Sequence, residues 1–313
     1  MAISSHVSSF AGRSVAEFDP AQGIRDPQGT AYALRLEYGT NDTFADIFEL
    51  LLQAPKADNL EALVIGVWAQ DLYGREATSE FVVEALVAAR ERLPGLQALF
   101  IGDITYEESE ISWIEQSNVG PLLEAYPLLE VFQVRGGNSL GFRFVEPERP
   151  VTHERLRELV VQSGGLDKSV LQSICEAHLP NLEHLELWLG TDDYGANSTV
   201  EDLAPILEGT RFPKLTYLGL RDSDIADEIA KALATAPILS RVQELDLSMG
   251  TMTDEGMLAL FDGLIYTLLQ TLDVSENFLS PELVKRLREI PFNVITTGQK
   301  EADDDWRYVS VGE

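Results

Sequence analysis

One short pattern of apolar positions recurs along this chain. It consists of an apolar residue, two others, a second apolar residue, one other and a third apolar residue. Because successive side chains of a strand point to opposite faces, each copy predicts a short strand with one apolar face turned toward a core. Nine copies occur, and they begin at Ala31, Leu60, Leu96, Leu129, Leu156, Leu182, Leu215, Val242 and Leu269.

The copies begin 29, 36, 33, 27, 26, 33, 27 and 27 residues apart. Several of these spacings fall in the range of about 20–29 residues that holds one strand and one helix of a repeat. Between the copies, apolar residues recur at three- and four-residue spacing, which predicts helices. The predicted helices span 43–54, 78–92, 114–126, 166–178, 199–208, 224–236, 253–265 and 280–290.

One repeat departs from this unit. Residues 136–150 read GGNSLGFRFVEPERP, with adjacent glycines, two prolines and an alternating GFRFV run. Glycine and proline are poor helix residues, and alternation is typical of a strand. We therefore predict an extended segment here, on the side that the helices occupy elsewhere.

The fold class that follows is α/β. Repeated strand and helix units can pair their strands in parallel, so the pattern predicts a solenoid with strands on a concave face and helices on a convex face. We expect one domain over residues 1–313. Residues 1–30 form an N-terminal cap, 31–290 form about nine repeats, and 291–313 form a C-terminal cap, because a terminal repeat would otherwise expose its apolar face.

The repeat motif resembles that of the leucine-rich-repeat superfamily, of the longer ribonuclease-inhibitor-like kind. In the last copy, LQTLDVSENFL, Asn277 stands at the ladder position of that family's consensus. Four further stretches and the closing RYVSVGE resemble a bacterial family of leucine-rich-repeat proteins without a defined biochemical function. The stretches are LVVQSGGL at 159–166, LEHLELWLGTDDYG at 182–195, LGLRDSDIADEIAKAL at 218–233 and LDLSMGTMTDEG at 245–256. The resemblance implies protein binding and carries over no catalytic residue.

The charge of the chain narrows the choice of partner. It has 52 acidic and 23 basic residues, a formal net charge of −29. Nucleic acid binding needs Lys and Arg to neutralise phosphates, and so negative a field repels nucleic acid and anionic lipid. We therefore expect a protein partner, neither nucleic acid nor a membrane. The charge serves either solubility alone or the steering of a basic partner.

Cysteine use and the hydropathy of the chain indicate its compartment. Cys175 is the single cysteine, so no disulfide within the chain is possible, which is typical of a reducing cytoplasm. The first residues lack the pattern of a signal peptide, and no run approaches about 18 apolar residues. We therefore expect a cytoplasmic protein. The sequence assigns no oligomeric state.

The strand pattern predicts which side chains face a ligand. Alternation turns the third, fifth and seventh residues of each copy to the concave face. In the N-terminal copies these residues are small or apolar, with Val64 beside Phe100 and Trp68 just beyond. In the later copies they include aromatic and charged residues. Trp, Tyr and Arg are the residue types that dominate binding hot spots. The partner-binding candidates are His184, Glu186, Trp188, Tyr217, Arg221, Glu244 and Asp246. The alternative for Trp188 is packing beneath the loop at 191–198.

Other chemistry has weaker support. His184, Glu186, Asp192 and Asp193 lie close together in sequence, but their spacing matches no zinc or calcium signature, so we expect no metal. No phosphate-binding loop of the form GxxxxGK[ST] occurs, and we expect no cofactor. Cys175 falls in a helical apolar pattern, which predicts a buried thiol.

These observations favour a non-enzymatic interaction module that binds a protein or peptide on its concave face. A more specific alternative is an acidic inhibitor or immunity protein that masks a basic enzyme. An enzyme or an enzyme activator, such as a GTPase activator, is a third alternative. No catalytic residue can be assigned for it.

Overall fold

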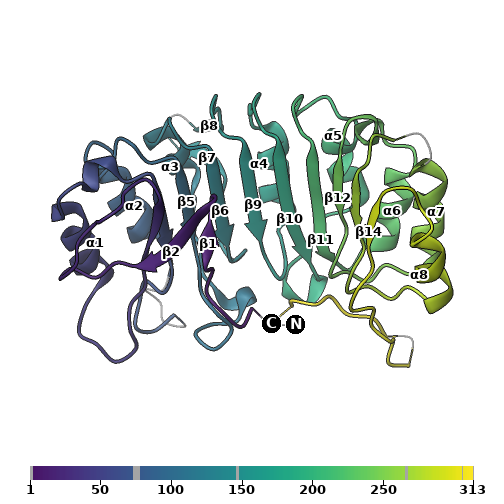
Figure 1. The fold of residues 1–313 in the computed structure, drawn as a ribbon, viewed down its shortest axis with the longest axis horizontal. Coiled ribbons are helices and arrows are strands. Elements are labelled where there is room, and N and C mark those ends of the chain that lie inside the picture. The colour runs from purple at the N-terminus through teal and green to yellow at the C-terminus, as the bar shows by residue number, and fades with distance from the viewer. Residues whose placement is uncertain (1–2, 73–77, 146–147, 265–266, 305, 313) are drawn as a thin grey trace. The chain divides into compact units, whose positions relative to one another are not determined.

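The computed structural model describes residues 3–72, 78–145, 148–264, 267–304 and 306–312 (Figure 1). Residues 146–147 of the predicted extended segment and residue 265 of a predicted helix lie outside these ranges. The chain divides into two compact units. We call the first, up to Val161 with Glu176–Leu179, the N-terminal unit. We call the second, Gln162–Cys175 with Pro180–Gly312, the C-terminal unit.

The strands of the N-terminal unit follow one another in chain order. They are β1 (Ser9–Phe10), β2 (Arg13–Glu17), β3 (Thr30–Leu34), β4 (Ala62–Ile65), β5 (Ala98–Ile101), β6 (Val131–Arg135) and β9 (Glu158–Gln162). Among these strands, β1 and β2 pair antiparallel, and β2 to β6 pair in parallel. The second apolar residues of successive copies are direct partners, Leu63 with Leu99 and Leu99 with Phe132. The predicted strands and their register are therefore confirmed here.

Helices α1 (Phe44–Gln53), α2 (Glu80–Ala88) and α3 (Gly120–Ala125) separate these strands, with 3-10 turns at Ala57–Asn59 and Ile111–Trp113. Helix α3 is shorter than the predicted 114–126. Pro121 lies in its first turn, and proline lacks the N–H that a position further inside the helix must donate. The helix therefore cannot extend toward residue 114.

The departing repeat forms an extended segment, as predicted. Its strand β7 (Arg143–Val145) pairs antiparallel with β8 (Glu148–Pro150) and contacts α3. The Asn118 amide donates to the Arg143 carbonyl oxygen at 2.8 Å and so joins the segment to the start of α3.

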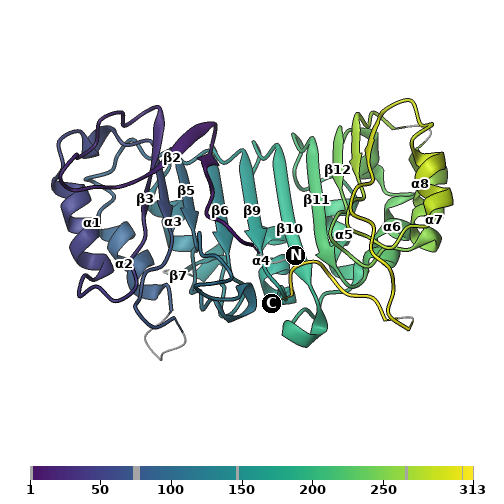
Figure 2. The same ribbon diagram turned by 60° about the horizontal axis from the view of Figure 1, so that its bottom comes forward.

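The C-terminal unit repeats the same construction. Its strands β10 (His184–Gly190), β11 (Tyr217–Ser223), β12 (Glu244–Asp246), β13 (Thr271–Asp273) and β14 (Asn293–Ile295) are parallel and in chain order. Its helices are α4 (Lys168–Glu176), α5 (Ala204–Leu207), α6 (Ala226–Leu233), α7 (Asp254–Leu264) and α8 (Pro281–Leu287). Figure 2 shows α6, α7 and α8 on one side of these strands. The α/β fold with parallel strands and a separate helix layer is confirmed in both units.

Two elements of the C-terminal unit differ from the prediction. The helix predicted over 199–208 is a 3-10 turn (Val200–Leu203) followed by the single turn of α5, which begins at Ala204 and has Pro205 in its first turn. Strand β14 was not predicted, because its sequence lacks the leucine pattern. Residues 307–311, expected within the C-terminal cap, form no strand, but Val309 and Val311 are buried.

Buried leucines and one asparagine hold the repeats of the C-terminal unit in register. Leu218, Leu245 and Leu272 are direct partners and at most 1% exposed. Asn277 is fully buried, and its amide donates to the Leu247 carbonyl oxygen at 2.9 Å in the preceding repeat. Asn277 therefore fills the ladder role that its place in the motif predicted, because it satisfies backbone groups that no strand partner reaches.

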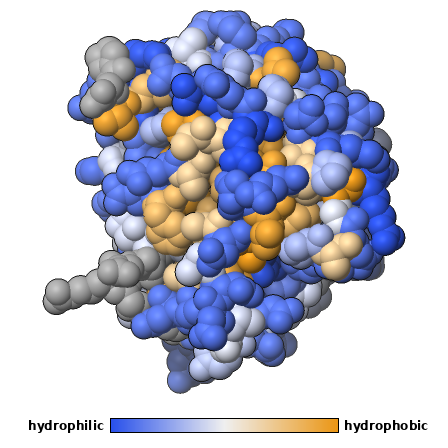
Figure 3. Space-filling view, turned by 90° about the vertical axis from the view of Figure 1, so that its left-hand side faces the viewer, coloured by the Kyte–Doolittle hydropathy of each residue, from blue (hydrophilic) through white to orange (hydrophobic). Residues whose placement is uncertain are grey.

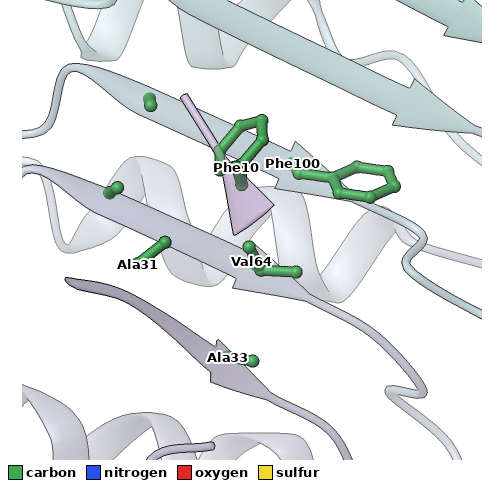
Figure 4. Packing of buried hydrophobic residues seen from close by; sticks show 7 residues of the cluster. Phe10, Ala31, Ala33, Val64 and Phe100 are labelled. Carbon is green, nitrogen blue, oxygen red and sulfur yellow. The ribbon is translucent and has the colours of Figure 1, made fainter. Parts of the chain in front are cut away.

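The strand face turned away from the helices, which we call the open face, is covered in the N-terminal unit. Val64 and Phe100 point to this face as predicted, yet both are fully buried. Phe10 packs on them, with its ring centre 5.8 Å from that of Phe100 (Figure 4). The expectation that these apolar residues line an accessible surface is therefore wrong, because the N-terminal segment covers them. Trp68 is also buried, at 1% exposed.

The helix side of the N-terminal unit is less completely covered. Figure 3 looks at its N-terminal end and shows apolar side chains gathered among hydrophilic ones. Helix α1 buries Phe44, Phe48 and Leu51, but it leaves Leu50 46% exposed. The strand layer of the first repeat is therefore more fully buried than its helix.

Candidate binding site

Strands β10, β11 and β12 bring most of the candidate residues together on the open face of the C-terminal unit. His184 is the direct partner of Tyr217, and Trp188 is the direct partner of Arg221. Tyr217 is in turn the partner of Glu244. Neighbouring strands lie about 4.8 Å apart, so side chains at partner positions touch.

Arg221 is the centre of the site. Its Nη1 donates to Glu186 Oε1 at 3.0 Å, and its Nε lies 3.3 Å from Asp246 Oδ2. Its guanidinium carbon lies 5.3 Å from the centre of the Trp188 ring, a distance at which a cation and an aromatic face attract. The side chain is 22% exposed, so Arg221 is only partly covered by its neighbours.

Trp188 also contacts Glu186. Its indole Nε1 donates to Glu186 Oε1 at 2.7 Å, and the residue is 6% exposed. The prediction that Trp188, Tyr217 and Arg221 form one cluster is confirmed by these contacts. Because Arg221 has the larger exposed share, we expect a partner to meet its guanidinium before the indole.

Tyr217 links the remaining members. Its ring stacks on His184 with centres 3.7 Å apart and planes 5° from parallel. Its hydroxyl oxygen lies 3.1 Å from Glu186 Oε2 and 3.1 Å from Asp246 Oδ2. A hydroxyl has one proton, so Tyr217 donates to one carboxylate at a time.

The two carboxylates that share Arg221 differ in their pKa. Burial alone would raise the pKa of Glu186, but hydrogen bonding to His184, the charge of Arg221 and the Trp188 N–H lower it to about 2. Burial raises the pKa of Asp246, and the neighbouring Asp273 adds to this rise against the opposing charge of Arg221. Glu186 is therefore the principal counter-ion of Arg221.

Glu244 takes no part in this network. It is exposed at the margin of the face, whereas the other six candidates contact one another. Two contacts of Arg221 were not among the candidates: Nε donates to Ser248 Oγ at 3.0 Å, and Nη2 lies 3.0 Å from Met249 Sδ. Ser248 is the seventh residue of the copy that begins at Val242, a position predicted to face this side. Met249 reaches Arg221 from a turn with φ of +70°, which the strand pattern does not indicate.

A second charged group, which the sequence did not predict, lies in the N-terminal unit. Asp103 is fully buried. Its carboxylate accepts a hydrogen bond from the Arg35 guanidinium and lies 3.5 Å from Arg135 Nη1. His6 lies between Asp103 Oδ2, at 3.5 Å, and Glu108 Oε1, at 3.3 Å. These residues are far apart along the chain, so no local pattern brings them together.

Neither group resembles a metal centre. Within the described residues, no three His, Cys, Asp or Glu side chains are placed to hold a metal ion. Cys175 is buried, as its helical pattern predicted. Among the helices that the structure describes, none is both long and apolar enough to cross a membrane.

Repeated strand and helix units, aligned leucines and an asparagine between repeats define a leucine-rich-repeat protein. The family model described as Leucine Rich repeat matches residues 213–234 and 242–261, which hold β11, α6, β12 and most of α7. The family model therefore identifies leucine-rich repeats in these residues of the chain. Repeats of this kind generally act in protein–protein interaction, because stacked units create extended binding surfaces.

Two solved structures are similar to this chain. A crystal structure of a protein from Bacteroides fragilis has 29% identity and a TM-score of 0.79, and the match covers 90% of this chain and 77% of that chain. An internalin from Listeria monocytogenes has 14% identity and a TM-score of 0.36, with 88% of this chain and 73% of that chain covered. A search of curated proteins found no significant match.

Proposed function

We propose that this chain is a non-enzymatic interaction module that binds a protein or peptide on the open face of β10, β11 and β12. The observation that carries the proposal is the arrangement of Arg221. Its guanidinium is fixed by two carboxylates and an aromatic ring, yet the side chain is partly exposed. Arginine, tryptophan and tyrosine dominate binding hot spots. Side chains that are already fixed lose little conformational entropy on binding.

Substitutions in the cluster test this proposal. Affinity capture with the wild-type chain provides a partner, and titration then measures its dissociation constant for Trp188→Ala and Arg221→Ala. We expect each change to weaken binding at least about tenfold, as is typical of a hot-spot residue. Lys231→Ala is the matched control, because Lys231 is exposed on α6 and pairs with Glu255, away from the open face. Unchanged affinity in both cluster variants, with circular dichroism showing that they are folded, would exclude the cluster.

A basic partner is the more specific form of the proposal, as in an acidic inhibitor that masks a basic enzyme. Glu186, Glu244, Asp246 and Asp273 stand at open-face positions of β10, β12 and β13. Arg221 of β11 is the single arginine or lysine among the described residues of strands β10 to β14. On the open face of β10 to β14, four carboxylates and one guanidinium give −4 + 1 = −3. A charged face raises the rate of association with a partner of opposite charge.

The charge reversal Glu244→Arg tests this form. Because Glu244 is exposed and outside the network, the change leaves the fold intact. Binding of a basic partner should slow in this variant, and the wild-type association rate should fall as salt screens the charges. An association rate that is the same from low salt to about 0.5 M would argue against a basic partner.

A further inference from the structure

The N-terminal segment Ile3–Phe10, which we call the strap, lies on the open face of the N-terminal unit as a bound peptide would. Its apolar contacts are Phe10, which is buried with Ala33, Ala62, Val64 and Phe100, and Val7, which is partly buried against the same cluster. Without the strap, these small and apolar residues would form the floor of an exposed surface, whose labelled members appear together in Figure 4.

A second contact is ionic. The His6 ring lies between the carboxylates of Asp103 and Glu108, at 3.5 and 3.3 Å. These carboxylates raise the pKa of His6 to about 9, so the ring is a cation at neutral pH. Its Nδ1 also lies 3.0 Å from the main-chain carbonyl oxygen of Asp103.

The net charge of the groups around the His6 ring favours a cation at this position. Apart from His6, the group holds three carboxylates, of Asp103, Glu108 and Glu17, and the guanidinium groups of Arg35 and Arg135. Their sum is −3 + 2 = −1, and one bound cation brings it to zero.

The strap is held by few main-chain bonds before β1 begins. The Tyr106 N–H donates to the Ile3 carbonyl oxygen at 2.9 Å, the Val7 N–H donates to Asp103 Oδ1 at 3.3 Å, and the Val15 N–H donates to the Ser8 carbonyl oxygen at 2.9 Å. Ser4, Ser5, Ser8 and Ser9 are exposed. A segment with few buried contacts and few ladder bonds opens at lower free energy than the strands beneath it.

We propose that the open face of the N-terminal unit is a peptide-binding groove that the chain's own strap occupies. The partner that fits is an extended peptide of another protein with a basic residue four positions before an aromatic residue. The basic side chain takes the seat of His6 between the carboxylates of Asp103 and Glu108. The aromatic ring takes the place of Phe10 on Phe100. Such a peptide binds after the strap has opened, so the strap lowers its apparent affinity.

The full-length variant His6→Ala/Phe10→Ala tests this assignment, because it keeps the strap and removes both anchors. The probe is a fluorescein-labelled synthetic peptide of residues 3–13, ISSHVSSFAGR, followed by fluorescence anisotropy. The matched control is the same peptide with His6→Ala and Phe10→Ala. We expect the variant to bind the wild-type probe at least tenfold more tightly than the wild-type chain does, and more tightly than it binds the control peptide. A folded variant that binds neither peptide, or both equally, would overturn the proposal. A dimer that exchanges straps in place of peptide binding would assign the groove to a second copy and also overturn it.

Hydrogen exchange of the wild-type chain decides the matter if the double variant does not fold. We expect the Val7 N–H to exchange at least a hundredfold faster than the β5 amides beneath it, since the strap opens without global unfolding. Equal protection of Val7 and β5 would mean that the strap is a permanent part of the core and would refute the proposal. This readout does not involve β10 to β12, so it is independent of the function proposed for that face.

Discussion

The titration of His6 offers a quantitative test of the contacts that hold the strap. Its hydrogen bond to Asp103, followed by that to Glu108, raises its pKa from 6.5 to about 9. A group whose pKa is raised in the folded state contributes stability that is complete below its unfolded pKa and is lost as the pH rises through the folded one. We therefore expect this contribution to be complete below pH 6.5 and to disappear as the pH rises through about 9.

The size of the effect follows from the same shift. The difference of 9 − 6.5 = 2.5 units corresponds to about 3.4 kcal/mol at 1.36 kcal/mol per unit. The His6 side chain is 32% exposed, and solvent screening reduces the contribution to about 1–3 kcal/mol.

Urea unfolding of the wild-type chain and of His6→Gln, at about pH 6 and about pH 10, measures this contribution. The wild type should lose about 1–3 kcal/mol more than the variant between the two conditions. Titrations of other groups are common to both proteins and cancel in the comparison. A difference between the proteins that does not change with pH, or an NMR titration of His6 near 6.5, would refute the geometry of the strap.

Three further changes test the repeats. Leu245→Ala should cost about 2–5 kcal/mol of unfolding free energy through a buried cavity, whereas the neighbouring Glu244→Ala should change it by less than about 0.5 kcal/mol. A loss below about 1 kcal/mol for the leucine would mean that the strand register is wrong. Gly190→Ala should destabilise more than Gly195→Ala in chemical denaturation, because both have positive φ but only at Gly190 does an added Cβ come 1.9 Å from a carbonyl oxygen. Asp222→Asn should raise the melting temperature at about pH 8 and not at about pH 4, because burial raises the pKa of Asp222 to about 7 and its stabilising contribution is lost as the pH rises through that value. Equal melting temperatures of this variant and the wild type at both pH values would contradict the assignment.

The amino-acid pattern by itself determined the repeat, the nine strands and the face of each. These are local properties. In a strand such as LEHLEL or LTYLGL, alternate side chains point to opposite faces, so the leucines share the inward face regardless of the rest of the chain. The same alternation identified the neighbourhood of Trp188, Tyr217 and Arg221, because parallel strands of equal repeats must align. The extended segment at 136–150 was also predictable from its glycines and prolines.

Only the tertiary structure decided which open-face residues are covered and how the charged ones are paired. From the sequence, Val64 and Phe100 were expected on an accessible apolar surface, but the strap covers them. The strap carries no repeat motif, so the pattern does not predict its position. Asp103 and His6 lie 97 residues apart, and Met249 reaches Arg221 from a left-handed turn. Such contacts depend on where distant segments meet in space. They are stabilised by packing and ion pairing between residues that are far apart in the sequence, so a local pattern cannot predict them.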